Sequence, residues 1–369
     1  MALFIGLMSG TSLDGVDAVL AEFSQHGAPK SLAHRHTGFN TELVRELLAL
    51  NQAAENELHR AALASNGLMQ AYAGVVAGVL RDAGVASSAV RAVAAHGQTV
   101  RHRPGEFDGL GYTLQLMNGA LLAERCDIDV ICDFRRRDVA AGGQGAPLVP
   151  AFHQAVFARA GTSLAVLNIG GMANLTLLPA GGAVGGFDCG PGNALMDAWC
   201  LRHTGAAFDG AGQWAASGQI NAALLRRLLA DPFFQRQPPK STGRDLFNTK
   251  WLDAALAGEP QVAADVQATL AELTACSAAQ ALNAHAAGTQ ELLVCGGGAF
   301  NAHLMRRLAT LLPGVQVAST ATRGVPPDQV EALAFAWLGW AFTTRRAGNL
   351  AAVTGARGPR VLGALYPAR

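Results

Sequence analysis

The chain has 369 residues, of which 50% are hydrophobic and only 15% are charged, and its formal net charge is +1. This composition excludes a disordered or fibrous protein and is sufficient for two domains that each have a hydrophobic core. Because the chain has no run of Lys and Arg that could follow a phosphate backbone, nucleic acid is not expected as a partner.

The cysteines and the N-terminus exclude two further classes. The six cysteines form no CxxC pair and no His/Cys cluster with zinc spacing, so we expect free thiols in a reducing compartment. The first residues, MALFIGLMSGT, lack the basic and long apolar regions of a signal peptide. The apolar stretch 333–342 is shorter than the ~20 residues needed to span a bilayer. We therefore expect a cytoplasmic protein that has no membrane partner.

The first half of the chain predicts a hairpin followed by helices. Short apolar strands at 4–7 and 16–21 flank a polar loop that contains glycine, which is a hairpin signal. Apolar residues at helical spacing predict helices over 42–51 and 55–83, and the run 90–95 predicts a buried strand.

The second half repeats this pattern, with a strand over 164–169, a glycine turn over 170–173 and a second strand over 174–178. Two such units half a chain apart suggest two related halves, and the alternation of strands with helices predicts α/β layers with mixed sheets. The Gly- and Pro-rich stretch 138–150 is the expected crossing between the halves. The other predicted elements are helices over 192–204, 218–229, 262–285 and 301–312 and a strand over 291–295.

The first loop, residues 8–17, combines small residues, hydroxyl groups and the carboxylates of Asp14 and Asp17. Glycine lets main-chain N–H groups approach phosphate oxygens, and a carboxylate can hold Mg²⁺ directly or through water. An Asp/Gly turn with Asp14 as a local cap explains the same composition. The chain contains no Walker loop.

Two further glycine-rich segments, 168–174 and 295–301, are also candidates for nucleotide contacts. Residues 295–301 lie between a predicted strand and a predicted helix, whose N-terminus can accept an anion. One such segment is more often a tight turn than a site, but three in one α/β chain favour a nucleotide held between two halves.

Three side chains are candidates for acid–base or anion chemistry. Asp188 precedes the turn Gly190-Pro191-Gly192, which can hold a general base at a cleft, although an ordinary aspartate at a helix start is an equal explanation. Arg135 lies in the charged run 133–138 and can clamp a phosphate or carboxylate. His96 follows a buried strand, where α/β folds place ligand contacts. A solvated charged face and a core histidine are the simpler alternatives.

Taken together and in this order, these segments resemble the anhydro-N-acetylmuramic acid kinase family from residue 5 to about residue 340. The opening motif 6–17 and the segment 187–197 are specific to that family, whereas the glycine loops alone are not. Cys189 stands where Thr would be expected beside the presumed base. The other matching segments are 96–99, 115–119, 133–135, 142–150, 168–174, 239–244 and 295–301.

The resemblance implies the actin/hexokinase/Hsp70 type of fold. This fold has two actin-like α/β ATPase domains, with mixed sheets of about five strands flanked by helices and an ATP cleft between the domains. We expect an N-terminal domain over 1–140, on which the C-terminal segment 345–369 can pack, and a C-terminal domain over 141–344 that carries the nucleotide-side loop.

The resemblance also implies a reaction. An ATP-dependent sugar kinase would open 1,6-anhydro-N-acetylmuramic acid with water and phosphorylate O6, giving N-acetylmuramic acid 6-phosphate and ADP during cell-wall recycling. Asp188 would activate the water that attacks C1, and Asp14 would hold Mg²⁺ through its water shell. The family further implies a homodimer.

The implied binding residues form two groups. The ATP-binding group is Gly10, Thr11, Ser12, Leu13, Asp14, Gly15, Val16, Asp17, Asn168, Gly170, Gly171, Asn174, Gly296, Gly297, Gly298 and Asn301. The candidates for the sugar are His96, Thr99, Gln115, Asn118, Arg135 and Asp188.

Two other functions stay open on the sequence. One is a kinase of the same fold that acts on a plain sugar or a carboxylic acid, and it would place no solvent oxygen at C1. The other is a non-catalytic, nucleotide-switched filament former or sugar-sensing regulator. A filament former would sediment in an ATP-dependent way, and a regulator of this fold usually carries an added DNA-binding module.

Overall fold

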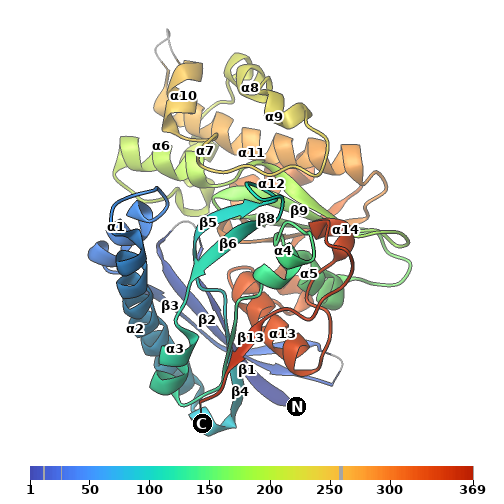
Figure 1. Ribbon diagram of the computed structural model, residues 1–369. Coiled ribbons are helices and arrows are strands. Elements are labelled where there is room, and N and C mark those ends of the chain that lie inside the picture. Colours follow the sequence, from blue (N-terminus) through green and yellow to red (C-terminus); the bar gives the residue numbers. More distant parts are fainter. Residues whose placement is uncertain (11–12, 26, 257–260, 369) are drawn as a thin grey trace. The chain divides into compact units, whose positions relative to one another are not determined.

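The computed structural model describes all residues except 11–12, 26, 257–260 and 369, and the chain forms two compact α/β units (Figure 1). Unit 1 consists of Met1–Val156 and Gln329–Arg369, and unit 2 consists of Phe157–Asp328. These limits differ from the expected boundaries at 140/141 and 344/345. The main reason is that helix α13 (Val330–Thr343) packs on the sheet of unit 1.

The sheet of unit 1 has six strands in the order β13-β7-β4-β1-β2-β3. Three consecutive strands run antiparallel, β4 is parallel to β1, and β7 is parallel to β4. The C-terminal strand β13 adds antiparallel to β7 at the edge. The strands predicted at 4–7, 16–21 and 90–95 are confirmed. The bounds are β1 Ala2–Met8, β2 Gly15–Phe23, β3 Pro29–Gly38, β4 Val90–Ala95, β7 Val130–Cys132 and β13 Ala364–Tyr366.

The sheet of unit 2 has five strands in the order β10-β9-β8-β11-β12. Its first three strands again run antiparallel, β11 is parallel to β8, and β12 is parallel to β11. Five strands therefore have the same order and directions in both units, and the predicted pair of mixed α/β sheets is confirmed. The bounds are β8 Leu164–Ile169, β9 Met172–Leu178, β10 Gly185–Pro191, β11 Glu291–Cys295 and β12 Gln316–Ser319.

Helices cover both faces of the unit 1 sheet. Side chains of a strand alternate between faces; Ile5 and Leu7 of β1 lie in one core cluster with α2 (Glu57–Ala83), whereas Gly6 faces α13. A Cβ on Gly6 would lie 1.9 Å from Ala332 O, so only glycine allows this close approach of helix to strand. The other helices of unit 1 are α1 Thr41–Ala49, α3 Gly119–Cys126, α4 Arg136–Ala140, α5 Val149–Phe157 and α14 Ala351–Thr354.

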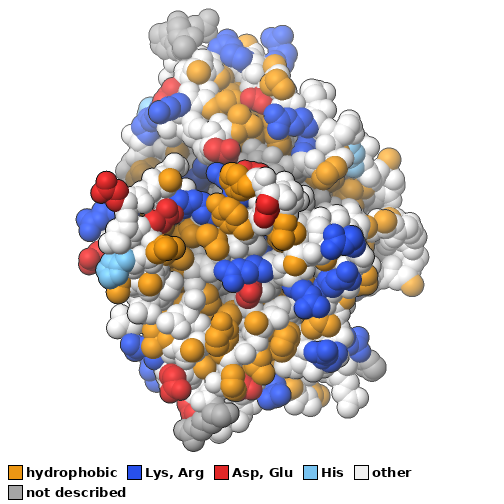
Figure 2. Space-filling view, in the orientation of Figure 1, with side chains coloured by type: hydrophobic (Ala, Val, Ile, Leu, Met, Phe, Trp, Pro, Cys, Tyr) orange, Lys and Arg blue, Asp and Glu red, His pale blue; other side chains and the backbone are white. Residues whose placement is uncertain are grey.

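Helix α2 raises the question of whether a helix of this protein could span a membrane. Its 27 residues are long and apolar enough to cross a bilayer by length and composition alone. Its side chains Leu68, Met69 and Tyr72 are fully buried in the core of unit 1, so α2 is accounted for as a core helix. On the face drawn in Figure 2, acidic and basic side chains are scattered among uncharged and hydrophobic ones, as the small net charge leads one to expect.

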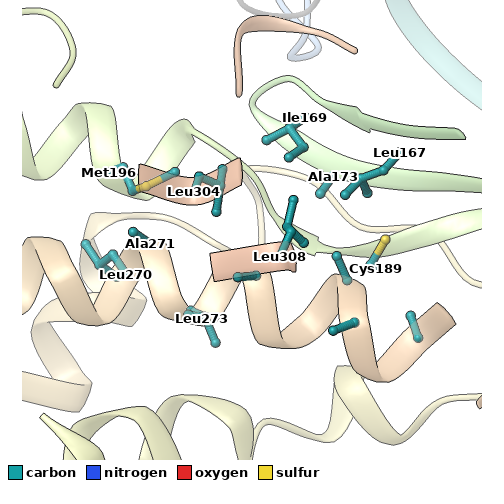
Figure 3. Packing of buried hydrophobic residues seen from close by; sticks show 14 of the residues in the cluster. Leu167, Ile169, Ala173, Cys189, Met196, Leu270, Ala271, Leu273, Leu304 and Leu308 are labelled. Carbon is teal, nitrogen blue, oxygen red and sulfur yellow. The ribbon is translucent and has the colours of Figure 1, made fainter. Parts of the chain in front are cut away.

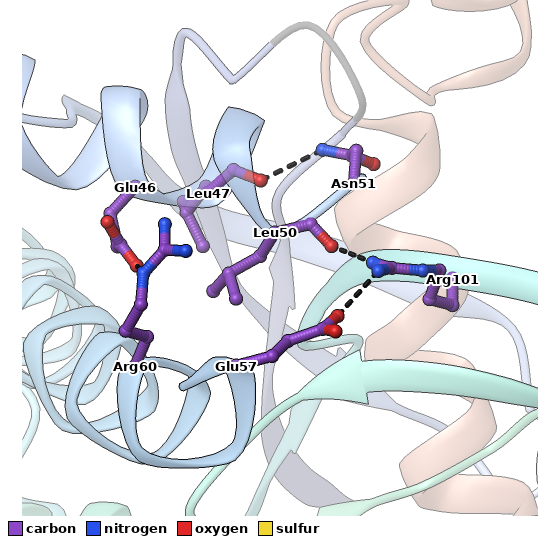
Figure 4. Close-up of polar contacts among 7 residues, drawn as sticks. All are labelled: Glu46, Leu47, Leu50, Asn51, Glu57, Arg60 and Arg101. Carbon is purple, nitrogen blue, oxygen red and sulfur yellow. Dashed lines mark hydrogen bonds and ion pairs between the residues drawn. The ribbon is translucent and has the colours of Figure 1, made fainter. Parts of the chain in front are cut away.

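A two-stranded hairpin of unit 1 is fixed to the connection between α1 and α2. Arg101 of β5 (Gln98–Pro104), which pairs with β6 (Gly111–Leu116), donates to Leu50 O and pairs with Glu57 (Figure 4). Beside this contact, Arg60 Nε lies 2.7 Å from Glu46 Oε1. The hairpin carries two of the expected sugar-binding residues, so this anchor sets their position in unit 1.

The C-terminal segment is tied to unit 1 by a buried carboxylate. Asp138 has no exposed surface. Its Oδ1 accepts from Asn349 Nδ2 over 2.5 Å and from Thr354 Oγ1 over 2.8 Å, and its Oδ2 accepts from Gly145 N over 2.8 Å. One side chain therefore joins α4 to the loop after it and to residues 349 and 354 of the C-terminal segment.

The core of unit 2 is built around the long helix α11 (Ala263–His285). Leu270 and Leu273 of α11 lie in one cluster with Leu304 and Leu308 of α12 (Ala302–Leu311) and with Leu167 of β8 (Figure 3). The remaining helices are α6 Ala194–Thr204, α7 Gln213–Ser217, α8 Ala222–Leu229, α9 Pro232–Gln235 and α10 Thr249–Leu256.

The helix predicted over 218–229 is wrong at its start. Gly218 ends α7, and a Cβ there would lie 2.1 Å from Ala264 O. Asn221 begins α8, because its side chain accepts from the N–H groups of Ala223 and Leu224. The apolar periodicity of α8 therefore starts only after a capping residue.

Candidate active site

The loop between β1 and β2 is held by side chains from the end of β4 and the start of β5. His96 Nδ1 donates to Ser9 O over 3.3 Å, and Gln98 Nε2 donates to Gly10 O over 3.1 Å. The main chain at Ser9 and Gly10 of this predicted phosphate loop is thus held from within unit 1. Two of its expected ligand-binding residues lie outside the described residues: Thr11 and Ser12.

The other residues of this loop divide into buried and accessible ones. Leu13 and Val16 are buried, and a Cβ on Gly15 would lie 2.3 Å from Thr37 O. These three residues set the path of the chain. The side chain of Asp14 is exposed.

Beside this loop, the buried His96 pairs with the half-buried Arg135. Arg135 donates to His96 Nε2 from Nε over 3.0 Å and from a terminal nitrogen over 2.9 Å, and it also donates to Gly145 O over 2.8 Å. Burial, with the charge of Arg135, lowers the pKa of His96 to about 3, and burial lowers the pKa of Arg135 to about 10. His96 is therefore neutral near pH 7 with both ring nitrogens engaged, so it positions groups and does not transfer protons.

Three carboxylates gather in unit 1 near this pair. Burial raises the pKa of Glu331, in the first turn of α13; Asp17 and Asp14 raise it further, and Arg135 lowers it. Asp17 Oδ1 also lies 2.9 Å from His34 Nε2. Oxygen donors of this kind suit Mg²⁺, which usually keeps several waters and binds through one or two carboxylates and substrate phosphates. In the described ranges, no set of three His, Cys, Asp or Glu residues is arranged to hold a metal ion by itself.

The remaining expected sugar-binding residues lie on the hairpin and on a helix start. Gln115 Nε2 donates to Thr99 Oγ1 across the hairpin over 3.1 Å. Asn118 caps α3, because its Oδ1 accepts from Leu121 N over 3.1 Å, and its Nδ2 donates to Asn66 Oδ1 over 3.0 Å. The structure brings His96 and Arg135 to the first loop, whereas Asn118 has a structural role at its helix.

In unit 2, the turn between β8 and β9 is locked to the start of α6. Gly171 O accepts from Gly192 N over 2.9 Å, and Gly170 O accepts from Asn193 N over 2.8 Å. A Cβ on Gly192 would lie 2.3 Å from Gly170 O, whereas a Cβ on Gly170 would meet nothing closer than 3.8 Å. Packing within the protein therefore requires glycine at residue 192 but does not require it at residue 170.

These contacts give a stability prediction. The variant Gly192→Ala is expected to lose about 1–3 kcal/mol of stability, because its methyl group must displace main chain that cannot move cheaply. Gly170→Ala is the matched control, with an expected change within ±0.5 kcal/mol. Thermal unfolding of both variants checks this, and equal unfolding temperatures would contradict the tight packing at Gly192.

The triple glycine after β11 packs on the end of β8. A Cβ on Gly296 would lie 2.5 Å from Asn168 Oδ1, and a Cβ on Gly298 would lie 2.4 Å from the side chain of Ile169. A Cβ on Gly297 would lie 3.4 Å from Asn193 Nδ2. The two glycine segments of unit 2 are therefore neighbours at the carboxyl ends of parallel strands, where α/β sheets bind ligands. Asn301, also expected to contact nucleotide, caps α12 by accepting from Leu304 N.

Three polar residues lie in a row across the antiparallel strands of unit 2. Asn168 on β8 is opposite Asn174 on β9, and Asn174 is opposite Asp188 on β10. Residues directly opposite one another place their side chains on the same face of a sheet. This row connects the glycine segments to the predicted base.

Asp188 lies on β10, beside an irregularity in the pairing with β9 between Asp188 and Gly190. Asp188 N donates to Lys240 O over 3.1 Å, and Asp188 Oδ2 accepts from Thr242 N over 2.9 Å. Burial raises the pKa of Asp188 to about 6, although the Thr242 N–H lowers it. A carboxylate with a pKa near neutrality is suited to general base catalysis. Burial also raises the pKa of the neighbouring Cys189 thiol, so it is an inert packing group.

Sequence reasoning missed the partners that position these groups. Thr242 lies 54 residues from Asp188 in the chain, and the residue types of the segment 239–244 do not by themselves indicate a contact with that carboxylate. Glu331 could have been suspected as the only charged residue of the otherwise apolar helix α13.

The comparisons with known proteins cover almost the whole chain. The family model described as anhydro-N-acetylmuramic acid kinase matches residues 2–368. The chain is 61% identical to the anhydro-N-acetylmuramic acid kinase of Variovorax paradoxus (strain S110), covering 99% of each protein. It is 55% identical to that of Cupriavidus metallidurans, covering 99% of this chain and 97% of the relative.

Among solved structures, the chain is similar to the activator of the 2-hydroxyisocaproyl-CoA dehydratase from Clostridium difficile with bound ADPNP. The two share 11% sequence identity, with a TM-score of 0.49 over 93% of this chain and 96% of that chain. This distant likeness has no bearing on the site. The match over residues 2–368 and the identity of the relatives leave one conclusion: the chain belongs to the anhydro-N-acetylmuramic acid kinase family.

Proposed function

We propose that this protein is an ATP-dependent kinase that opens 1,6-anhydro-N-acetylmuramic acid with water and phosphorylates O6. The products are N-acetylmuramic acid 6-phosphate and ADP, and the role is the recycling of peptidoglycan in the cytoplasm. Membership of the family over the whole chain supports the reaction. The observation that carries it is Asp188, a carboxylate with its pKa raised to about 6 and one oxygen held by Thr242 N.

The reaction needs one base and one phosphoryl acceptor. Asp188 takes a proton from a water molecule while the water oxygen bonds to C1 of the sugar. The C1–O6 bond breaks, and O6 attacks the γ-phosphorus as the bond from that phosphorus to the bridging oxygen breaks and ADP leaves. Because O6 is captured by phosphorus, no separate acid is needed. Thr242 N holds Oδ2 of Asp188, which leaves Oδ1 to receive the proton.

The glycine segments supply the groups that hold ATP. Positioning and charge neutralisation are most of what phosphoryl transfer requires. The loop 10–17 of unit 1 and the segments 168–174 and 296–301 of unit 2 would offer main-chain donors to the phosphates. Asp14, with Asp17 and Glu331 nearby, would hold Mg²⁺ through its water shell. When bound, this ion offsets the negative charge of the phosphates.

The sugar carries a carboxylate on its lactyl group, and Arg135 would be the cation that binds it. The half-buried guanidinium is already oriented by His96 and Gly145, so little of its conformational freedom would be lost on binding a carboxylate. Thr99 and Gln115 on the hairpin are further candidates. We also propose a homodimer with no nucleic-acid or membrane partner.

A coupled ADP-release assay tests the reaction. Anhydro-N-acetylmuramic acid should give ATP-dependent turnover, and a panel of ordinary hexoses should not. In water enriched in ¹⁸O, the label should appear at C1 of the product. Turnover of a hexose without label at C1 would favour a plain sugar kinase and overturn the proposal.

The raised pKa of Asp188 predicts a pH dependence. The base must be ionised, so kcat/KM should fall about tenfold per pH unit below the pKa of about 6. About one pH unit above this pKa the carboxylate is almost fully ionised, and this group should cause no further increase. Initial rates between pH 5 and 8, with unfolding followed at each pH, check this. A rate that is flat down to pH 5 would exclude Asp188 as the base.

A further inference from the structure

The segment Lys240–Arg244 contacts Asp188 with its main chain and carries an arginine that the reaction above does not use. We propose that Arg244 binds the terminal phosphates of ATP at the Gly170–Gly171 turn, so that one short segment positions both the base and a phosphate-binding cation. This inference rests on the proposed function, because it needs ATP as a substrate.

The guanidinium of Arg244 lies beside the turn. Its terminal nitrogen is 3.7 Å, and its Nε is 4.0 Å, from the position that a Cβ on Gly171 would occupy. Any side chain at residue 171 would therefore stand between Arg244 and a ligand at the turn. Glycine at this position keeps the peptide open to a phosphate.

The turn itself offers a donor. Gly170 O accepts from Asn193 N, and in a planar trans peptide the N–H points opposite to the C=O. The N–H of Gly171 therefore points away from the start of α6. A phosphate oxygen bound to this N–H would lie within reach of the Arg244 side chain.

Arg244 is available for such a contact. Its charge lowers the pKa of Asp197 of α6, and within the described part of the chain its guanidinium makes no hydrogen bond or ion pair. Arginine binds phosphate through two parallel N–H groups, which lysine cannot reproduce. An exposed arginine next to an open glycine turn is thus matched to a phosphate.

Two anchors fix the backbone around Arg244. On one side, Thr242 N donates to Asp188 Oδ2. On the other, Leu246 N and Phe247 N donate to Gly243 O over 3.2 and 3.0 Å, and Phe247 is buried in the core. The spacing between the base and the cation is therefore set by two residues of held main chain. The base that acts at C1 and the cation that binds the phosphates are therefore kept at a constant distance from each other.

The test compares Arg244→Gln with Arg236→Gln in the full-length protein. Arg236 lies in the preceding loop, over the ring of Phe233 at 5.9 Å, and serves as the matched control. Calorimetric titration with ATP and with AMP, each with Mg²⁺, should show ATP binding weakened about 10- to 100-fold in Arg244→Gln. AMP binding should stay within about twofold of wild type, since AMP lacks the terminal phosphates.

Two further variants separate a ligand contact from a structural role. Gly171→Ala places a methyl group 3.7–3.8 Å from its neighbours, which the fold accommodates, and it should weaken ATP binding without lowering the unfolding temperature. Arg244→Ala should regain part of its kcat when guanidinium is added at low millimolar concentration, an effect that a merely structural arginine would not give.

The inference is overturned if Arg244→Gln binds and turns over ATP as Arg236→Gln does. It is also overturned if Arg244→Gln loses affinity for ATP and for AMP by the same factor. If the Arg244 variant loses ATP affinity as expected but the wild-type protein does not consume the anhydro sugar, the inference stands and the proposed substrate is wrong.

Discussion

Replacing Asp188 with Asn should lower kcat by about 10²- to 10⁴-fold, the usual contribution of a positioned general base. The amide oxygen of Asn can still accept from Thr242 N, so the geometry of the 240–242 segment should persist. ATP binding, measured by titration, should therefore be retained while ADP release with the anhydro sugar is lost. Asp253→Asn is the control, because Asp253 pairs with Arg202 on the surface of unit 2.

The same variant has a consequence for stability, and its sign follows from the pKa. Folding raises the pKa of Asp188 from 3.8 to about 6, so the fold favours the protonated form, and the stabilisation by this group is lost as pH rises through 6. At pH 7, Asp188→Asn cannot ionise and should unfold at the same or a higher temperature than wild type. Near-normal turnover would remove Asp188 from the base role, and a large drop in unfolding temperature would make lost activity uninformative.

Replacing Asp138 with Ala should cost about 3 kcal/mol or more of stability, because it leaves buried donors without an acceptor. The donors are Asn349 Nδ2, Thr354 Oγ1 and Gly145 N. Two of them belong to the C-terminal segment, so we also expect faster proteolytic removal of that segment.

The control for this change is Asp82→Ala. Asp82 pairs with Arg35 at the surface of the same unit, and an exposed pair contributes at most about 1 kcal/mol. Thermal unfolding and limited proteolysis of both variants check the prediction. An Asp138→Ala protein with the stability of Asp82→Ala would show that the buried network contributes little.

Much of the fold followed from local patterns. The strands β4, β8 and β11 were predicted at their observed bounds, because short apolar runs between loop residues leave few alternatives. Strand β10 was missed because it contains three glycines and a proline, which are depleted in strands. Its pairing with β9 overrides that preference, and such pairing cannot be read from β10 alone.

The site shows the same division. The sequence identified Asp188, Arg135 and the glycine segments as candidates from their residue types and from the resemblance that they carry together. It could not show that Thr242 holds the carboxylate or that Glu331 lies among the charges of the first loop. Those contacts join residues far apart in the chain, and their distances are set by the packed units and not by spacing.

The contact between Gly6 and Ala332 has a consequence for biosynthesis. The first strand leaves the ribosome long before the helix that covers it, and all of unit 2 is made in between. Unit 2 is continuous in sequence and can fold as it emerges, whereas one face of the N-terminal sheet stays bare until translation is nearly complete. We therefore expect nascent chains truncated before residue 330 to bind chaperones through this uncovered sheet.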